Sequence, residues 1–141
     1  MATVIEVLME DHRLVDRLFE HYAVSHDREV AAQIGDALVL HARIEEEFLY
    51  PLVRSLLIDG DRLADEAEAD HEKVKEFVAE AEDTRGAALD ELIVELRADV
   101  GVHVRWEEED LFPRLLDELD AGTQQQLAER LLAFKRSQPV V

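Results

Sequence analysis

Cysteine is absent from the 141 residues, and glycine and proline are scarce, with 5 and 3 copies. The lack of thiols excludes disulfide frameworks, zinc–thiolate sites, iron–sulfur clusters and cysteine nucleophiles. Any bound metal must therefore be held by histidine, carboxylate, phenolate or backbone oxygen. Because helix breakers are few and β-branched alternation is nearly absent, the composition favours long helices.

Positive charge is also scarce, since 15 basic residues stand against 34 acidic ones and the formal net charge is -19. Such a field repels phosphate, which makes nucleic acid and anionic membrane surfaces poor partners. No apolar run approaches the ~18 residues that a membrane span needs. The start, Met1 to Glu6, lacks the basic and apolar regions of a signal peptide. We therefore expect a cytoplasmic protein without membrane or nucleic-acid partners, as a monomer or weak homodimer.

The spacing of apolar residues predicts five helical segments. Their expected ranges are about 3–22, 28–57, 62–83, 87–119 and 123–136. Thr3 and Glu6 form a capping-box pattern at the start of the first segment. Four long segments with short connections predict an all-α fold, an antiparallel up-down-up-down four-helix bundle over about 3–119, with a short fifth C-terminal helix. We expect the whole chain, 1–141, to form a single domain, with a loose tail at 139–141.

The chain contains an internal repeat. One window runs from His41 to Pro51 and the other from His103 to Pro113, and seven of their eleven positions are identical. Each window is preceded by an Asp-His pair, at residues 11–12 and 70–71. The sequence therefore predicts two copies of one helical hairpin. The proline at the end of each window should kink its helix or end it early.

Each copy offers a lone histidine on one helix and a His-x-x-x-Glu pair on the next. Residues four apart project from one face of a helix, and apolar neighbours on that face indicate that the pairs lie inside the bundle. Buried without partners, these groups would cost several kcal/mol. A cation resolves this, because imidazole with carboxylate suits iron, manganese or zinc, and carboxylates between helices suit a two-metal site. The candidate metal ligands are His12, His41, Glu45, His71, His103 and Glu107.

This pattern of His12, then His41-x-x-x-Glu45, then His71, then His103-x-x-x-Glu107 resembles the hemerythrin-like, or HHE cation-binding, family. The resemblance covers about residues 5–118. It implies a four-helix bundle around two iron ions joined by an oxo or hydroxo bridge. It further implies that His12 and His41 bind one iron, that His71 and His103 bind the other, and that Glu45 and Glu107 bridge both.

The resemblance departs from the oxygen carriers of marine invertebrates at two places. Those carriers have a further histidine where this chain has Lys75, a poor ligand when protonated. Their last carboxylate is an Asp five residues after its histidine, whereas here it is Glu107, at four. The chain thus fits the bacterial HHE type, with a sixth coordination position open on both irons unless water or the phenolate of Tyr22 or Tyr50 closes one.

Two open irons favour redox turnover with hydrogen peroxide, dioxygen or nitric oxide over reversible oxygen carriage. Whether this makes the chain an enzyme stays open, since catalase-like, peroxidase-like or nitric oxide-reacting activity would each fit, with no catalytic residue beyond the ligands. One alternative is a module that senses or stores iron or oxygen without turnover. Another is a metal-free, acidic helical bundle that binds a partner protein.

Six acidic residues beside the ligands have expected roles of their own. Asp11 and Asp70 precede their histidines and should face away from the centre, as helix caps or solvated side chains. The acidic residues that follow the candidate bridging carboxylates either orient ligand N–H groups or are solvated or paired with Arg43 and Arg105; they are Glu46, Glu47, Glu108 and Glu109.

Overall fold

The structure, a computed structural model, describes residues 3–138, and every regular element in that range is helical. The long elements are α1 (Val4–Ser25), α2 (Arg28–Ile44), α4 (Gly60–Glu82), α5 (Gly86–Trp106) and α7 (Ala121–Ser137). Two of them continue through short π-helical segments. After α2 come η1 (Glu45–Leu49) and then α3 (Tyr50–Leu56). After α5 come η2 (Glu107–Leu111) and then α6 (Phe112–Leu116). The tail at 139–141, expected to be loose, lies outside the described residues.

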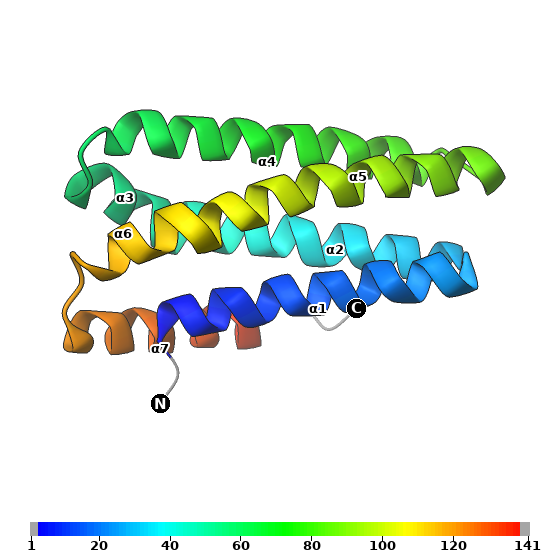
Figure 1. The fold of residues 1–141 in the computed structure, drawn as a ribbon. Helices are drawn as coiled ribbons and strands as arrows, with labels where there is room; N and C mark the ends of the chain where they lie inside the picture. Colours follow the sequence, from blue (N-terminus) through cyan, green and yellow to red (C-terminus); the bar gives the residue numbers. More distant parts are fainter. Residues whose placement is uncertain (1–2, 139–141) are drawn as a thin grey trace.

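The predicted four-helix bundle is confirmed. α1 and α2 form one antiparallel hairpin and α4 and α5 form the other, while α2 also packs on α4 and α1 on α5 (Figure 1). The C-terminal α7 lies beside the N-terminal part of α1, at the end of the bundle that holds α3 and α6 (Figure 1). Thr3 caps α1 as expected, accepting from the backbone N–H of Glu6 at 3.2 Å.

The two repeated prolines act on the turn that precedes them. A proline lacks an N–H, and its ring clashes with the carbonyl four residues earlier in an α-helix. Here that turn widens: the N–H of Tyr50 donates to Glu45 O, and the N–H of Phe112 donates to Glu107 O, five residues back in each case. Each proline then stands in the first turn of a new α-helix, where its missing N–H is tolerated.

Two hydrophobic clusters fill the interior, one on either side of the histidines along each helix. On α1, His12 falls between Leu8 of the first cluster and Val15 of the second. The first cluster also takes in Leu131 of α7, which is fully buried. A buried aliphatic side chain of this size contributes about 1.5–3 kcal/mol. The clusters therefore hold the histidine layer in a dry and closely packed setting.

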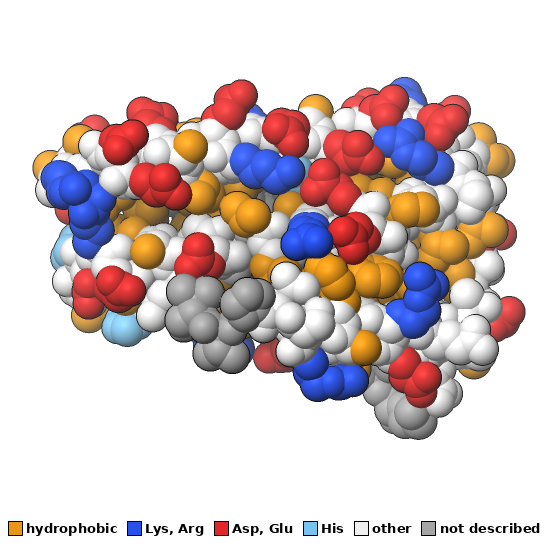
Figure 2. Space-filling model, turned by 180° about the vertical axis from the view of Figure 1, so that it is seen from behind, with side chains coloured by type: hydrophobic (Ala, Val, Ile, Leu, Met, Phe, Trp, Pro, Cys, Tyr) orange, Lys and Arg blue, Asp and Glu red, His pale blue; other side chains and the backbone are white. Residues whose placement is uncertain are grey.

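The surface carries most of the charge. Acidic side chains follow the upper edge of the molecule in Figure 2, where α4 lies, with basic ones among them. On the same face, hydrophobic side chains show mainly toward the end of the bundle that holds α3, α6 and α7 (Figure 2). None of the helices in residues 3–138 combines the length and the hydropathy that a membrane span needs.

Candidate metal centre

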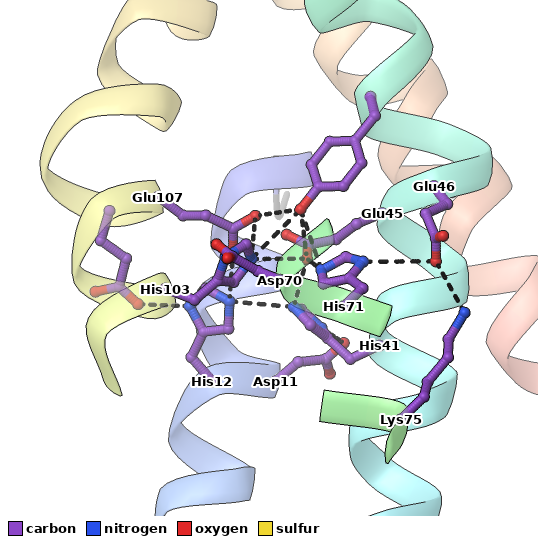
Figure 3. Close-up of polar contacts among 12 residues, drawn as sticks. Asp11, His12, His41, Glu45, Glu46, Asp70, His71, Lys75, His103 and Glu107 are labelled. Atoms are coloured by element: carbon purple, nitrogen blue, oxygen red, sulfur yellow. Dashed lines mark hydrogen bonds and ion pairs between the residues drawn. The ribbon is translucent and has the colours of Figure 1, made fainter. Parts of the chain in front are cut away.

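The six predicted ligands meet at one level of the bundle (Figure 3). They come from six elements: His12 (α1), His41 (α2), Glu45 (η1), His71 (α4), His103 (α5) and Glu107 (η2). Glu45 and Glu107 are fully buried, at 0% exposure, and the side chain of the most exposed histidine, His103, is 11% exposed. Residues far apart in the sequence therefore form one enclosed polar cluster.

The ligand atoms fall into two groups. One group contains His12, His41, Glu45 and Glu107, and the other contains Glu45, His71 and His103, with all ligand atoms of a group within 4.8 Å of one another. Glu45 belongs to both groups. Glu107 also reaches both, since its Oε1 is 3.2 Å from His12 Nε2 and its Oε2 is 3.4 Å from His103 Nε2. Each carboxylate thus lies between a pair of histidines from one hairpin and a pair from the other.

Buried polar atoms without partners show that the cluster suits a cation. Within residues 3–138, Glu45 Oε2, Glu107 Oε1 and His71 Nδ1 are buried and make no hydrogen bond. A buried polar group left unpaired costs about 1–3 kcal/mol, and more when it is charged. Four imidazoles with two carboxylates are a donor set that a transition-metal ion satisfies. The residues present therefore fit a bound metal.

The raised pKa values of two histidines also indicate that the cluster suits a cation. Burial acts to lower the pKa of His41, but the charge of Glu45 and a hydrogen bond with Asp11 outweigh it and raise that pKa to about 10. Burial also opposes the charged form of His103, yet Glu107 and Glu45 raise its pKa to about 11. The cluster therefore binds positive charge strongly, and protons compete with metal for the same atoms.

A carboxylate orients the far nitrogen of one histidine in each hairpin. His41 Nδ1 is 3.1 Å from Asp11 Oδ2, and His103 Nδ1 is 3.0 Å from Asp70 Oδ2. The expectation of helix caps or solvated side chains was therefore wrong for Asp11, which is 11% exposed, and incomplete for Asp70, which is 56% exposed but also contacts a histidine of the centre. Each side chain does turn away from the histidine next to it in sequence, but it reaches the histidine on the neighbouring helix. A carboxylate at Nδ1 favours a proton there and leaves Nε2 as the ligand atom.

Glu108 and Glu46 act between the hairpins. His12 Nδ1 is 2.7 Å from Glu108 Oε2, as expected of an orienting carboxylate. His71 Nδ1 lies 3.5 Å from Glu46 Oε2, which is an ion-pair distance without a hydrogen bond. Each hairpin therefore supplies the carboxylate beside the lone histidine of the other.

Burial acts to raise the pKa of Asp11, but hydrogen bonds with His41 and Lys135 outweigh it and hold that pKa below its usual value.

Tyr50, one of the two tyrosines named as able to close a coordination position, reaches the centre. Its hydroxyl donates to Glu107 Oε2 at 2.8 Å and to Glu45 Oε1 at 3.2 Å, and it is 3.2 Å from His71 Nε2. In an α-helix, positions 45 and 50 would be about 140° apart, but the π-turn brings them to one face. Burial and the two carboxylates raise the pKa of Tyr50 well above its usual value.

Tyr22, the other tyrosine that could close a coordination position, and Lys75, at the position of the carriers' further histidine, lie away from the ligand atoms. Tyr22 donates its hydroxyl to Asp90 Oδ1 at 2.7 Å and belongs to the second hydrophobic cluster. Lys75 Nζ is 3.2 Å from Glu72 and 3.8 Å from Glu46, and so faces the rim of the centre rather than its ligand atoms (Figure 3).

An apolar cavity of about 30 Å³ lies against the histidines. The four ligand histidines line it together with hydrophobic side chains that include Val15, Leu38 and Val74. A cavity that holds one water needs roughly 10–15 Å³ on this measure. The space beside the ligand atoms is therefore large enough for a small molecule.

Comparison with known proteins gives two matches. Residues 3–115 match the family model of the hemerythrin HHE cation-binding domain. A DNA nickase from Nostoc sp. (strain PCC 7120 / SAG 25.82 / UTEX 2576) is 31% identical over 136 residues, which is 92% of this chain and 38% of that protein. The chain therefore spans well under half the length of this relative. No solved structure matches the chain significantly.

Proposed function

The chain belongs to the hemerythrin HHE cation-binding domain family, and from this premise we propose that it is a two-iron protein that reacts with dioxygen, hydrogen peroxide or nitric oxide. One observation carries the proposal: four histidines meet two fully buried carboxylates, and an oxygen of each carboxylate has no hydrogen-bond partner within residues 3–138. In this proposal His12 and His41 hold one iron, His71 and His103 hold the other, and Glu45 and Glu107 are shared.

An iron pair, when bound, would supply the electrons that reduce a small oxidant. The residues of the chain orient the histidine rings and shape the space beside them. The carboxylates of Asp11, Asp70 and Glu108 orient three of the rings through Nδ1. The apolar cavity offers space for a small molecule on the histidine side of the centre.

Tyr50 supports turnover over reversible oxygen carriage. Its hydroxyl holds a proton that it donates to Glu107 Oε2, at the level of the ligand atoms. Reduction of peroxide to water consumes protons, so a buried proton donor serves that reaction. A carrier must instead release dioxygen unchanged.

The first test is metal content. Elemental analysis of aerobically purified protein should give about two irons per chain, and the same sample should show the near-ultraviolet absorption of an oxo-bridged pair. Protein that stays folded, contains no metal and takes up none on reconstitution would overturn the proposal. The metal-free interaction bundle would then be the surviving interpretation.

The second test is reactivity. The reduced, iron-loaded protein is mixed with one equivalent of hydrogen peroxide, dioxygen or nitric oxide, and consumption of the oxidant is followed together with the absorption spectrum. We expect consumption without a lasting oxygen adduct. An adduct stable for minutes would instead indicate carriage, and bound iron that consumes nothing would indicate sensing or storage.

The similarity to a DNA nickase favours DNA cleavage as a second candidate. The net charge of -19 opposes it, because the acidic surface repels the phosphate backbone. Incubating supercoiled plasmid with the protein and Fe²⁺, Mn²⁺ or Mg²⁺ decides the matter. Conversion to open circles that is lost in His41→Ala would support this candidate.

A further inference from the structure

α7 lies beyond the part of the chain that matches the family model, which ends at residue 115, yet its last turn reaches the metal centre. Lys135 Nζ donates to Asp11 Oδ1 at 2.5 Å, while Asp11 Oδ2 is 3.1 Å from His41 Nδ1. One carboxylate therefore joins a lysine of the C-terminal helix to a candidate metal ligand of α2.

The rest of α7 holds this lysine in place. Leu131 is fully buried in the first hydrophobic cluster. The Phe134 ring lies 5.4 Å from the Phe48 ring of η1, and the guanidinium of Arg43 lies 5.0 Å above Phe134. The helix turn that carries Lys135 is thus held by the packing of Leu131 and Phe134, and the Lys135 side chain itself is 30% exposed.

The equivalent carboxylate of the other hairpin has a different setting. Asp70 accepts from His103 Nδ1 as Asp11 does from His41 Nδ1, but the Asp70 side chain is 56% exposed against 11% for Asp11. Within residues 3–138, no lysine or arginine forms an ion pair with Asp70. Water can solvate that carboxylate, whereas the buried one needs a cation beside it.

We propose that α7 is a latch on one half of the metal centre. Lys135 is a positioning residue that holds Asp11 against His41 and so retains the metal bound by His12 and His41. Without the lysine, Asp11 is a buried carboxylate with a single partner; it turns toward solvent, and His41 loses its fixed orientation. The other half depends on no residue of α7. This inference rests on the proposed two-metal centre.

The test is the release of iron from Lys135→Met. The full chain is loaded anaerobically with Fe²⁺, and transfer to a coloured bidentate chelator is followed with time. Asp11→Asn and Asp70→Asn assign the two halves, since each should speed the loss of one iron. In Lys135→Met we expect the iron whose release depends on Asp11 to leave about tenfold faster, which is the lower end of the effect of such supporting groups. The release rate of the other iron should not change.

Three further variants test whether Lys135 acts by positioning Asp11, by adding a positive charge to the surface, or only through the packing of α7. Lys135→Arg should restore the wild-type release rate. Lys73→Met removes the same charge from a lysine that pairs with Asp99 at 3.2 Å on the surface, and it should leave both halves unchanged. Leu131→Ala undocks the helix that carries the lysine, and it should speed the same half as Lys135→Met.

The outcomes are distinguishable. Wild-type release rates in Lys135→Met, or equal acceleration of both halves in that variant, would overturn the latch while the two-iron centre stands. A wild-type chain that takes up no Fe²⁺ would overturn the centre and the latch together.

Discussion

The two hairpins supply the same ligand types from matching positions, yet they surround those ligands differently. Tyr50 of the first copy turns its hydroxyl into the centre, with its ring stacked on His71 at 5.4 Å. The matching residue of the second copy, Phe112, stacks on His12 at 5.9 Å and brings no polar atom. The one hydroxyl therefore lies beside the histidines of the second hairpin, and the apolar ring beside those of the first.

The orienting carboxylates differ in the same way. Glu108 is 2.7 Å from the lone histidine of the first hairpin, and Asp11 is additionally held by Lys135. Glu46 is 3.5 Å from the lone histidine of the second, and Asp70 is exposed. The comparison teaches that a duplicated set of histidines and carboxylates fixes what meets at the centre, while unmatched neighbours can make the two proposed metal positions inequivalent.

The largest expected effect comes from a residue that both halves share. Glu45→Gln keeps the size of the side chain but removes a carboxylate that contacts His41 at 3.4 Å and His71 at 3.1 Å. We expect both irons to bind at least about 100-fold more weakly, beyond the range of supporting groups alone. Glu47→Gln, in the same π-turn but exposed and paired with Arg43 at 3.3 Å, is the matched control. Retention of one tight iron would show that the halves do not share Glu45.

Tyr50→Phe makes the two copies alike at the residue before the repeated proline. The hydroxyl donates to two buried carboxylates, and hydrogen bonds to charged groups contribute about 1.5–3 kcal/mol. The metal-free variant should lose about that much unfolding free energy in urea, and the iron-loaded variant should consume peroxide more slowly. If the oxygen is a ligand instead of a proton donor, a visible phenolate band of the wild type should vanish.

Tyr22→Phe is the control for that change. It removes a buried tyrosine hydroxyl that donates to Asp90, away from the centre. Stability should fall, while peroxide consumption should not change. If both variants consume peroxide equally slowly, the Tyr50 hydroxyl is not the proton donor of the proposed reaction.

Much of this arrangement follows from the sequence, because the signals are local and repeated. Apolar spacing predicted the helices, and the duplicated His-x-x-x-Glu pattern predicted which residues meet. The π-turns were not predicted, since Pro51 and Pro113 were expected to kink their helices or end them early, and a widened turn before each proline was not considered. Ideal α-helical spacing through this turn would put Tyr50 about 140° from Glu45 around the helix axis, so spacing alone does not bring it to the centre. Asp11 and Asp70 were misjudged for a related reason: their partners lie on a neighbouring helix, which the spacing within one helix does not reveal.

A smaller effect should separate the carboxylates that act between the hairpins. Glu108→Gln weakens a 2.7 Å contact with His12, whereas Glu46→Gln alters only a 3.5 Å contact with His71. Loss of a supporting carboxylate costs about 10–100-fold in metal affinity. We expect about tenfold for Glu108→Gln, on one iron only, and clearly less for Glu46→Gln, measured by competition with a chelator. Equal losses would show that the difference in contact distance has no energetic consequence.

The smallest effect is expected at Lys75, where the oxygen carriers have a further histidine. Its ammonium pairs with Glu72 and Glu46 at the partly exposed rim, and pairs of this kind contribute about 0–1 kcal/mol. Lys75→His should therefore bind two irons and change stability by less than about 1 kcal/mol. Because Tyr50 already occupies the space between His71 and the two carboxylates, the new imidazole should not enter the centre unless that ring moves. A lasting oxygen adduct in the single variant Lys75→His would contradict this. An adduct that forms in the double variant Lys75→His/Tyr50→Phe, and not in the single variant, would show that Tyr50 sets this chain apart from a carrier.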